Sequence, residues 1–249
     1  MIKMKSIVRK MLRSSGYGVW RVNSYEFVNF YNFLYSIHNN SERLSYLQIG
    51  AHDGILVDPM YDFVLKHPNT VRGILIEPIP SVFEKLKTNY SNFPYIVPLN
   101  LAIHNSKRSA TMYKVKESVL PKKHKFASGW ASLDSMHWKR MDGIVESDIE
   151  EIVVNCMTVA EVLSKYEFGC PDVLVIDTEG YDYEILQDID LSAIRPILIR
   201  FEHGLSTKTM SSNELDQLIN KFNSHGYQVI LEQNDATALD TNFALNIFS

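Results

Sequence analysis

Apolar and polar positions along most of the chain follow a repeating order, in which a short apolar run precedes a stretch with helical spacing. Runs of four or five apolar residues are typical of strands that a parallel sheet buries on both faces. We expect strands at residues 46–49, 73–76, 95–99, 173–176, 197–201, 227–231 and 244–248. The last two can pair as an antiparallel edge. The pattern predicts an α/β fold with a doubly wound, mostly parallel seven-stranded sheet.

Two segments interrupt this order. Residues 1–40 contain two expected helices, and we assign them to an N-terminal helical extension of the main domain at 41–249. The first helix is basic on one side and apolar on the other, so it either caps the domain or forms a membrane-surface or dimerisation segment. Residues 103–171 form an insertion between sheet strands, with a helix expected after Thr158. Insertions of this length are usually functional.

Composition narrows the classes of protein that fit. The net charge of −4 over 249 residues argues against a nucleic-acid partner held by bulk electrostatics. Two cysteines in a chain of this length indicate a reducing compartment and no disulfide framework. No apolar run reaches the roughly 18 residues of a membrane span, and no long apolar segment follows the basic N-terminus as in a signal peptide. We therefore expect a cytoplasmic enzyme without a transmembrane segment.

A glycine turn and a carboxylate follow the first two expected strands. The turn is Gly-Ala-His-Asp-Gly at 50–54, and Glu77 ends the second strand. In a doubly wound sheet these strand ends lie side by side at the ligand-binding edge, where a carboxylate can accept the hydroxyls of a ribose. The glycines follow the pattern G-x-x-x-G and not G-x-G-x-x-G, which indicates a ligand with a ribose but no pyrophosphate. S-adenosylmethionine fits this description.

Four strings of residues carry a resemblance to a known family. They are Gln-Ile-Gly-Ala-His-Asp-Gly at 48–54, Ile-Glu-Pro at 76–78, Asn-Leu-Ala-Ile at 100–103 and Val-Ile-Asp-Thr-Glu-Gly-Tyr-Asp-Tyr-Glu-Ile-Leu at 175–186. Together they resemble the FkbM family of class I, S-adenosylmethionine-dependent methyltransferases. The resemblance implies a Rossmann-like fold and methylation of hydroxyl groups, commonly on sugars of polysaccharides, glycolipids or polyketide products. The chain departs from the family at His52, where Asn is common.

The resemblance and the residue types together predict a cofactor site at the strand ends. Its expected members are Gly50, Ala51, His52, Asp53, Gly54, Glu77, Pro78, Asn100, Leu101, Ala102 and Asp177. Gly50 and Gly54 let the backbone approach the ligand closely. Asp53 either receives the ammonium group of the cofactor or stabilises the turn. Glu77 either binds the ribose or charges a helix N-terminus, and Asn100 either borders the adenine or caps a strand end.

Methylation of a hydroxyl requires a general base or a metal to help remove the proton. The candidates follow the fourth and fifth strands, namely Asp177, Glu179, Glu202 and His203. We favour His203 as the base because an imidazole titrates near neutrality, although a packed, hydrogen-bonded histidine is the alternative. Glu202 is either catalytic or the ion-pair partner of Arg200, and Glu179 is either catalytic or a helix N-terminal charge. A metal bound by Asp177 and Glu202 would have few ligands, and we predict none.

The insertion is the expected border of the acceptor site. Residues 117–145 contain Trp130 and Trp138, whose rings suit sugar faces, and we expect the segment to be mobile when no acceptor is bound. The basic run at 122–125 either holds a phosphate or is a solvated surface. Three histidines in or beside the insertion can face an acceptor; they are His104, His124 and His137.

The expected partner is thus a carbohydrate or glycoconjugate acceptor, with a homodimer possible through the N-terminal extension. Two other functions stay open at this point. One is a nicotinamide-dependent oxidoreductase or epimerase, which the missing G-x-G-x-x-G motif and the missing Tyr-x-x-x-Lys pair disfavour. The other is a non-catalytic, methyltransferase-like partner protein, which the presence of four acidic residues at the strand ends disfavours.

Overall fold

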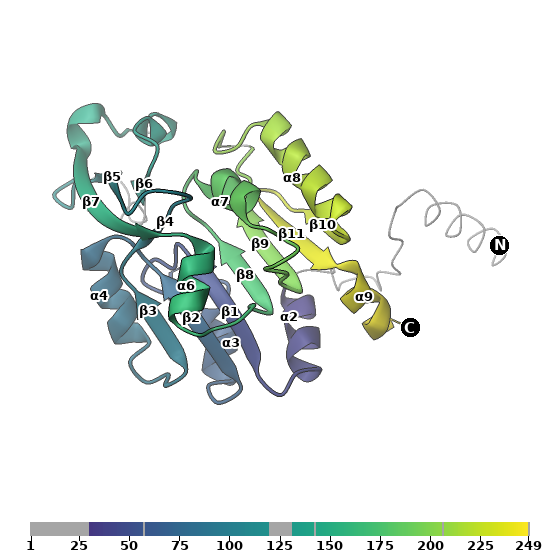
Figure 1. Ribbon diagram of the computed structural model, residues 1–249. Helices are drawn as coiled ribbons and strands as arrows, with labels where there is room; N and C mark the ends of the chain where they lie inside the picture. Colours follow the sequence, from purple (N-terminus) through teal and green to yellow (C-terminus); the bar gives the residue numbers. More distant parts are fainter. Residues whose placement is uncertain (1–29, 57, 120–130, 142, 206, 249) are drawn as a thin grey trace.

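A seven-stranded sheet runs through the centre of the molecule in the order β10-β11-β9-β8-β1-β2-β3 (Figure 1). The computed structural model describes residues 30–56, 58–119, 131–141, 143–205 and 207–248. The strands are β1 (Leu44–Ile49), β2 (Val71–Ile76), β3 (Ile96–Leu99), β8 (Val173–Ile176), β9 (Leu198–Glu202), β10 (Tyr227–Leu231) and β11 (Asp235–Asp240). β11 is antiparallel to both of its neighbours, and the other neighbouring pairs are parallel. The predicted α/β fold with a doubly wound, mostly parallel sheet is confirmed.

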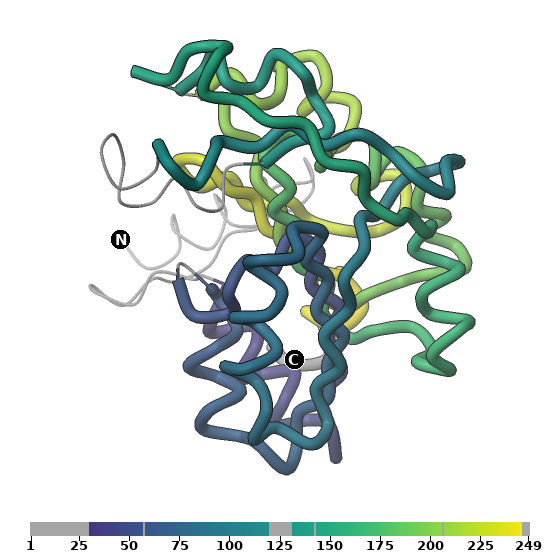
Figure 2. The backbone as a smooth tube through the Cα atoms, turned by 90° about the vertical axis from the view of Figure 1, so that its left-hand side faces the viewer, coloured from purple at the N-terminus to yellow at the C-terminus, as the bar shows by residue number. Residues whose placement is uncertain are grey.

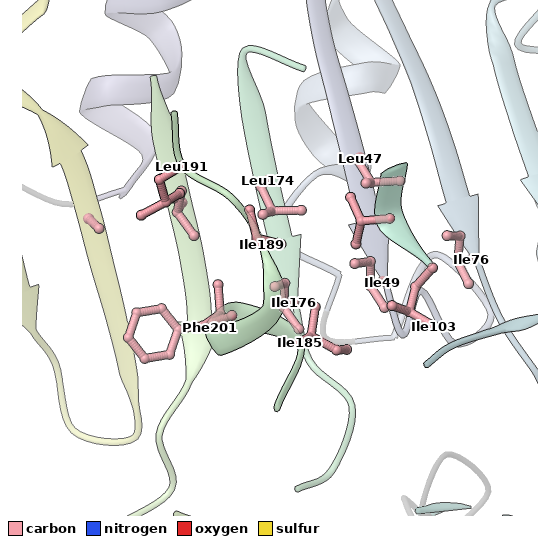
Figure 3. Close-up of a cluster of buried hydrophobic side chains, with 14 of the residues drawn as sticks. Leu47, Ile49, Ile76, Ile103, Leu174, Ile176, Ile185, Ile189, Leu191 and Phe201 are labelled. Atoms are coloured by element: carbon pink, nitrogen blue, oxygen red, sulfur yellow. The ribbon is translucent and has the colours of Figure 1, made fainter. Parts of the chain in front are cut away.

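Alternating side chains of the strands fill two cores, one on each face of the sheet. Leu47 and Ile49 of β1 point into the first core with Leu174 of β8 (Figure 3), whereas Tyr46 points into the second. The first core is covered by α6 (Val159–Lys165), α7 (Asp182–Asp188) and α8 (Ser212–Ser224). The second is covered by α2 (Phe30–Asn39), α3 (Tyr61–Lys66), α4 (Pro80–Asn89) and α9 (Thr241–Phe248). Because both faces are buried, the central strand β8 reads as a continuous apolar run, Val-Leu-Val-Ile.

A second, smaller sheet is formed by the expected insertion, in the order β4-β7-β5-β6. Its strands are β4 (Ala102–Ile103), β5 (Ser109–Val115), β6 (Ala131–Ser132) and β7 (Ile149–Met157). Two short 3₁₀ helices, η2 (His137–Arg140) and η3 (Glu146–Asp148), lie between β6 and β7. In Figure 2 the teal chain of this sheet lies at the top of the view, above the purple and blue elements that precede it in the sequence. Thr158 caps α6 as expected, since its side chain accepts a hydrogen bond from the amide of Glu161.

The prediction of a last strand at residues 244–248 is wrong. Residues 244–248 belong to α9, and the strand that pairs with β10 is β11, a few residues earlier. β11 reads Asp-Ala-Thr-Ala-Leu-Asp, and aspartate and alanine are depleted in strands, so its sequence gave a weak signal. Asp240 then begins the helix, because its carboxylate accepts a hydrogen bond of 2.8 Å from the amide of Asn242.

The described part of the expected N-terminal extension is α2, an amphipathic helix. Its apolar side chains pack into the second core; they are Phe30, Phe33, Leu34 and Ile37. Residues 1–29, with the basic helix and the dimerisation segment proposed for it, lie outside the described residues, as do the basic run at 122–125 and Trp130. Within the described ranges, no helix is both long enough and apolar enough to cross a membrane.

Candidate active site

The glycine turn after β1 joins three strand ends. Gly50 has a φ of +82°, and a Cβ at this position would lie 1.7 Å from the carbonyl oxygen of Asp177. The amides of Gly50 and Ala51 both donate a hydrogen bond to the carbonyl of Ile76, and the amide of Asp177 donates one to the carbonyl of Ile49, each at 2.9 Å. The ends of β1, β2 and β8 are therefore held together by main-chain contacts that leave no room for a side chain at Gly50.

Glu77 follows β2 directly and is 5% exposed. Its carboxylate accepts hydrogen bonds from the amides of His52 at 3.0 Å and Ile79 at 2.8 Å, one on each oxygen. Burial raises the pKa of Glu77 to about 7, an effect that these two hydrogen bonds oppose. Each carboxylate oxygen has about two acceptor positions, so Glu77 still has acceptor capacity for a ligand.

A cavity of about 290 Å³ opens beside these strand ends. One wall is apolar and combines Ile76, Ile79 and Ile103 with Met112 of the second sheet. The carboxylates of Glu77, Asp177 and Glu179 line it as well. Of the residues predicted for the cofactor, six line this cavity, namely Gly50, His52, Glu77, Pro78, Ala102 and Asp177. The predicted cofactor residues at the ends of β1, β2 and β8 are therefore brought together around one space.

The other predicted cofactor residues support the loops around the cavity. Asp53 accepts hydrogen bonds from the amides of Ile55 and Leu56, as expected for the turn-stabilising alternative. Partial burial disfavours its ionisation, but these amides lower the pKa of Asp53 overall. The side-chain amide of Asn100 donates to the carbonyls of Glu77 and Pro78. Ala51 and Leu101 are buried in the two cores, and a Cβ at Gly54 would collide with Tyr90 and Leu86.

An acidic turn lies between β8 and α7. Asp177 is open to the cavity, and Glu179 has a left-handed backbone with a φ of +56°. Asp182 is 1% exposed and stabilises the turn, because its carboxylate accepts hydrogen bonds from the amide and hydroxyl of Thr178. It also accepts one from the amide of Glu202 at 3.1 Å, which links the ends of β8 and β9. Asp182 was not among the predicted site residues, although an acidic residue in the first turn of a helix is a recognisable signal.

The carboxylates of this region share one electrostatic environment. Although Asp177 is open to the cavity, the protein packed around it reduces its solvation, and this and the negative charges of Glu179 and Asp182 raise its pKa above the usual range. Burial, with the charge of Asp182, raises the pKa of Glu179 to about 7, and burial raises that of Asp182 to about 6. Burial and the negative charges of Glu179, Asp182 and Asp235 raise the pKa of Glu202 to about 8. Carboxylates with raised pKa values are frequent in active sites, where side chains accept or donate protons.

Glu202 is not the partner of Arg200. The guanidinium of Arg200 contacts Glu232, in the turn between β10 and β11, at 3.0 Å and Asp235, the first residue of β11, at 2.7 Å. Oε2 of Glu202 is buried and has no hydrogen-bond partner within the described part of the chain. The ion pair expected as the structural alternative for Glu202 is therefore absent from the described contacts of Arg200.

His203 is 3% exposed at the end of β9, and it lines neither the cavity of about 290 Å³ nor a second cavity, of about 700 Å³, that adjoins it. Its Nδ1 accepts a hydrogen bond from the amide of Leu205 at 3.2 Å, and its Nε2 lies 3.3 Å from the carbonyl of Glu232. Because both ring nitrogens contact main-chain groups, this geometry is that of a packed, hydrogen-bonded histidine.

A second, more polar cavity of about 700 Å³ adjoins the first, and Leu133 and Tyr181 line both. Asp134 and Arg140 of the insertion line one side of it. The opposite side is formed by α7 and by the loop and first turn of α8, with Glu184, Lys208, Thr209, Ser211, Ser212 and Glu214. Oε2 of Glu184 is buried without a hydrogen-bond partner among the described residues. The insertion therefore borders a polar cavity, as its length suggested.

Of the three histidines expected near an acceptor, His137 reaches the acidic turn. It is 5% exposed, and its Nε2 lies 3.6 Å from Oε2 of Glu179. His104 packs against the ring of Tyr181 at the cavity border, with ring centroids 5.5 Å apart. His124 lies outside the described residues.

We expect Glu202→Gln to stabilise the protein at high pH and to leave its stability in acid unchanged. The pKa of Glu202 is about 8 in the folded state, and about 4.3 in an unfolded chain, so the free energy of unfolding falls as the pH rises between these values. Glutamine removes this loss, and we expect a gain of about 1–3 kcal/mol at about pH 8.

Urea unfolding at about pH 4 and about pH 8 measures this difference. The matched control is Glu151→Gln, which changes an exposed carboxylate on β7. A Glu202→Gln protein that is less stable than the wild type at both pH values would contradict the expectation.

Comparisons with known proteins give the family. The sequence profile described as "Methyltransferase FkbM domain" matches residues 48–229. No curated protein sequence matches the chain significantly. Among solved structures, the chain is similar to a human methyltransferase 10 domain containing protein, with 11% identity over 94% of this chain and 92% of that chain and a TM-score of 0.42.

Two further structures are similar to the chain at the level of the fold. The precorrin-6y C5,15-methyltransferase from Geobacter metallireducens is 11% identical over 89% of this chain and 97% of that chain, with a TM-score of 0.39. The fibrillarin of Aeropyrum pernix, solved with natively bound S-adenosyl-L-methionine, is 10% identical over 80% of this chain and 66% of that chain, with a TM-score of 0.38. The match of the family profile covers most of the chain, and the protein therefore belongs to the FkbM family of S-adenosylmethionine-dependent methyltransferases.

Proposed function

We propose that the protein transfers a methyl group from S-adenosylmethionine to a hydroxyl group of a carbohydrate. The observation that carries this proposal is the pair of adjoining cavities at the carboxyl ends of the strands. One is largely apolar with carboxylates at its edge, the other is polar, and Leu133 and Tyr181 line both. A transferase that joins a nucleoside cofactor to a hydroxylated acceptor needs two such spaces with a common border.

The residues of the first cavity fit S-adenosylmethionine. Its apolar wall, with Ile76, Ile79 and Ile103, suits the faces of an adenine ring. We assign the ribose hydroxyls to Glu77, which is buried and held rigidly by two main-chain amides. Asp177, open to the cavity beside Gly50, suits the ammonium group of the methionine part. The chain thus offers an apolar surface and two carboxylates, which match the three parts of this ligand.

The second cavity suits a polyhydroxylated acceptor. Its lining combines the hydroxyls of Thr209, Ser211 and Ser212 with carboxylates from both sides. Glu184 and Glu214 also line it, and their carboxylates are acceptors for the hydroxyls of a ligand. Sugar hydroxyls donate and accept hydrogen bonds at short intervals, which is what such a lining can satisfy.

We assign proton removal to Glu179 in place of His203. When bound, the cofactor supplies an electrophilic methyl group on a positively charged sulfur. Glu179 lines the first cavity at the turn whose next two residues, Gly180 and Tyr181, line the second. A carboxylate whose pKa is raised to about 7 is a better base than an ordinary one, and it is ionised in a large fraction of molecules at neutral pH. His203 has both ring nitrogens on main-chain groups.

The other two catalytic candidates take supporting roles in this proposal. Asp177 contributes to cofactor binding, as above. Glu202 supports the turn through its main chain, because its amide donates a hydrogen bond to Asp182. Asp182 in turn, together with burial, raises the pKa of Glu179. The described residues contain no group of three or more histidine, cysteine or acidic side chains placed to hold a metal ion.

Glu77→Gln is expected to weaken cofactor binding by about 10- to 100-fold, which corresponds to about 1–3 kcal/mol. The neutral amide loses a charge-assisted acceptor for the ribose, and its NH₂ group must face the amide of either His52 or Ile79. Calorimetric titration with S-adenosylhomocysteine measures the effect. Glu84→Gln, an exposed change on α4, is the control. Equal affinities for Glu77→Gln and the wild type would exclude Glu77 as the ribose ligand.

The function is tested by transfer of label from methyl-labelled S-adenosylmethionine into fractionated extracts of the source cell. We expect label in glycan fractions and an O-methylated sugar after hydrolysis, identified by mass spectrometry. Label in protein, nucleic-acid or lipid fractions without label in carbohydrate would contradict the acceptor class. Tight binding of S-adenosylhomocysteine with no transfer to any fraction would favour a non-catalytic partner protein, and binding of NAD instead would favour an oxidoreductase.

A further inference from the structure

The insertion contacts the acidic turn through the imidazole of His137. This side chain projects from η2, is almost fully buried, and places Nε2 3.6 Å from Oε2 of Glu179. The next residue of the turn, Gly180, has a φ of +110°, and a Cβ there would lie 3.2 Å from the guanidinium of Arg140. The insertion and the turn are therefore packed together where the two cavities meet.

The position of the ring proton follows from the other neighbour of His137. Nδ1 lies 3.3 Å from Nη1 of Arg140, and a guanidinium can only donate. Nδ1 must therefore accept, so a neutral ring carries its proton on Nε2, the nitrogen that faces Glu179. Arg140 is fixed in turn by Asp134, with 2.8 Å between Nη2 and Oδ2. Burial and the positive charge of Arg140 lower the pKa of His137 to about 4, so the ring is neutral at physiological pH.

We propose that His137 is a positioning residue for Glu179, whose carboxylate it holds at the border of the two cavities by donation from Nε2–H. The Nε2–Oε2 distance of 3.6 Å is longer than a hydrogen bond, so the donation that we propose requires the two side chains to approach by a few tenths of an ångström. This inference rests on the proposed function for its catalytic part, because it concerns the step that we assign to Glu179. The proton from the acceptor hydroxyl goes to the Glu179 carboxylate, and His137 keeps its own proton throughout.

The charges around Glu179 explain why a neutral donor is suitable there. Asp177, Asp182 and Glu202 lie close to it, at the end of β8, in α7 and at the end of β9. Burial and the negative charge of Asp182 raise the pKa of Glu179. On the side of the insertion, the charge of Arg140 is compensated by Asp134. A neutral N–H orients the carboxylate without the strong fall in pKa that direct contact with a cation would cause, so Glu179 stays basic.

The first test needs no substrate. Long-range ¹⁵N–¹H correlation spectra distinguish the two neutral tautomers of a histidine ring and its charged form. We expect His137 of the wild type to be the neutral Nε2–H tautomer from about pH 5 to about pH 8. We also expect its Nε2 resonance to shift in Glu179→Ala. A charged ring or the Nδ1–H tautomer over this range, or a resonance that Glu179→Ala leaves unchanged, would overturn the proposal.

The second test separates positioning from simple packing. We expect His137→Leu to lower kcat by about tenfold or more with little change in the KM for S-adenosylmethionine, and His137→Gln, which retains an N–H donor, to recover most of the loss. Lys139→Gln, an exposed change on the same 3₁₀ turn, is the control. Equal kcat for His137→Leu and the wild type, or equal losses in the Leu and Gln variants, would overturn the proposal. Absence of methyl transfer by the wild type would instead contradict the proposed function. The spectra would still show whether Nε2–H of His137 contacts Glu179.

Discussion

Gly50→Ala is expected to abolish cofactor binding and to destabilise the fold by about 4 kcal/mol or more, near the upper end of single substitutions. Two effects add. An L-residue at a φ of +82° costs about 1–2 kcal/mol. In addition, the new Cβ would lie 1.7 Å from the carbonyl oxygen of Asp177, a main-chain atom that cannot rotate away. The ends of β1 and β8 must separate, and both line the first cavity, which we assign to the cofactor. Urea unfolding and calorimetry with S-adenosylhomocysteine measure the two consequences.

Gly169→Ala is the matched control for this substitution. Gly169 has a φ of +75°, close to that of Gly50, but a Cβ there would meet nothing within 4 Å. We expect it to cost only the conformational term of about 1–2 kcal/mol and to leave cofactor binding unchanged. Similar losses of stability in the two variants, with cofactor binding retained in Gly50→Ala, would show that the ends of β1 and β8 can move apart freely. The close approach would then have no role in forming the site.

The parallel part of the sheet was predictable because both of its faces are buried. The run at 173–176 coincides with β8, since four apolar residues in a row suit a strand between two helical layers. β11 was not predictable in the same way. Its buried positions include Ala236 and Ala238, small residues with low strand propensity, between β9 and β10. β11 is held in place by pairing with β9 and β10, and the residues of a short sequence window do not contain information about this pairing.

The main-chain part of the candidate site also followed from the sequence. A glycine turn after one strand and a carboxylate after the next predicted that Gly50 and Glu77 would lie together, and both line the first cavity. The partners of charged side chains did not follow. Arg200 and Glu202 lie two residues apart in β9, yet Arg200 reaches diagonally across the antiparallel pair to Asp235. The ion-pair partners of Arg200 are Glu232 and Asp235, which are more than 30 residues away in the sequence.

His137 and His203, both buried, likewise have contacts that the neighbouring sequence does not specify. His203 stands at a strand end, where the sequence favours a catalytic base, but the amide of Leu205 and the carbonyl of Glu232 take its ring nitrogens. His137 lies far from the strand ends in the sequence, and the path of the insertion brings it to Glu179. Which ring reaches Glu179 is decided by tertiary packing, because motifs specify residue types near strand ends and do not specify how a long insertion returns to them.

Glu179→Gln is expected to lower kcat by about 10²–10⁴-fold while changing the affinity for S-adenosylhomocysteine by no more than about threefold. Glutamine has nearly the same shape as glutamate but cannot accept the proton of the acceptor hydroxyl. The ionised carboxylate is the active form, and the pKa of Glu179 is about 7. The wild-type kcat/KM should therefore rise with pH up to about 7 and level off above it, falling about tenfold per pH unit on the acid side. Steady-state kinetics across this range measure both effects.

The control for this variant is Glu167→Gln, because Glu167 is also a glutamate with a left-handed backbone, at a φ of 48°. It is exposed in the loop after α6 and lines neither cavity, so we expect kcat and the pH profile of the wild type. In Glu179→Gln the remaining activity should lose the rise of kcat/KM below about pH 7, since no carboxylate at this position titrates. A Glu179→Gln enzyme that keeps both the wild-type rate and the acid limb would show that another group removes the proton. The assignment of Glu179 as the base would then be wrong, even though cofactor binding and methyl transfer persist.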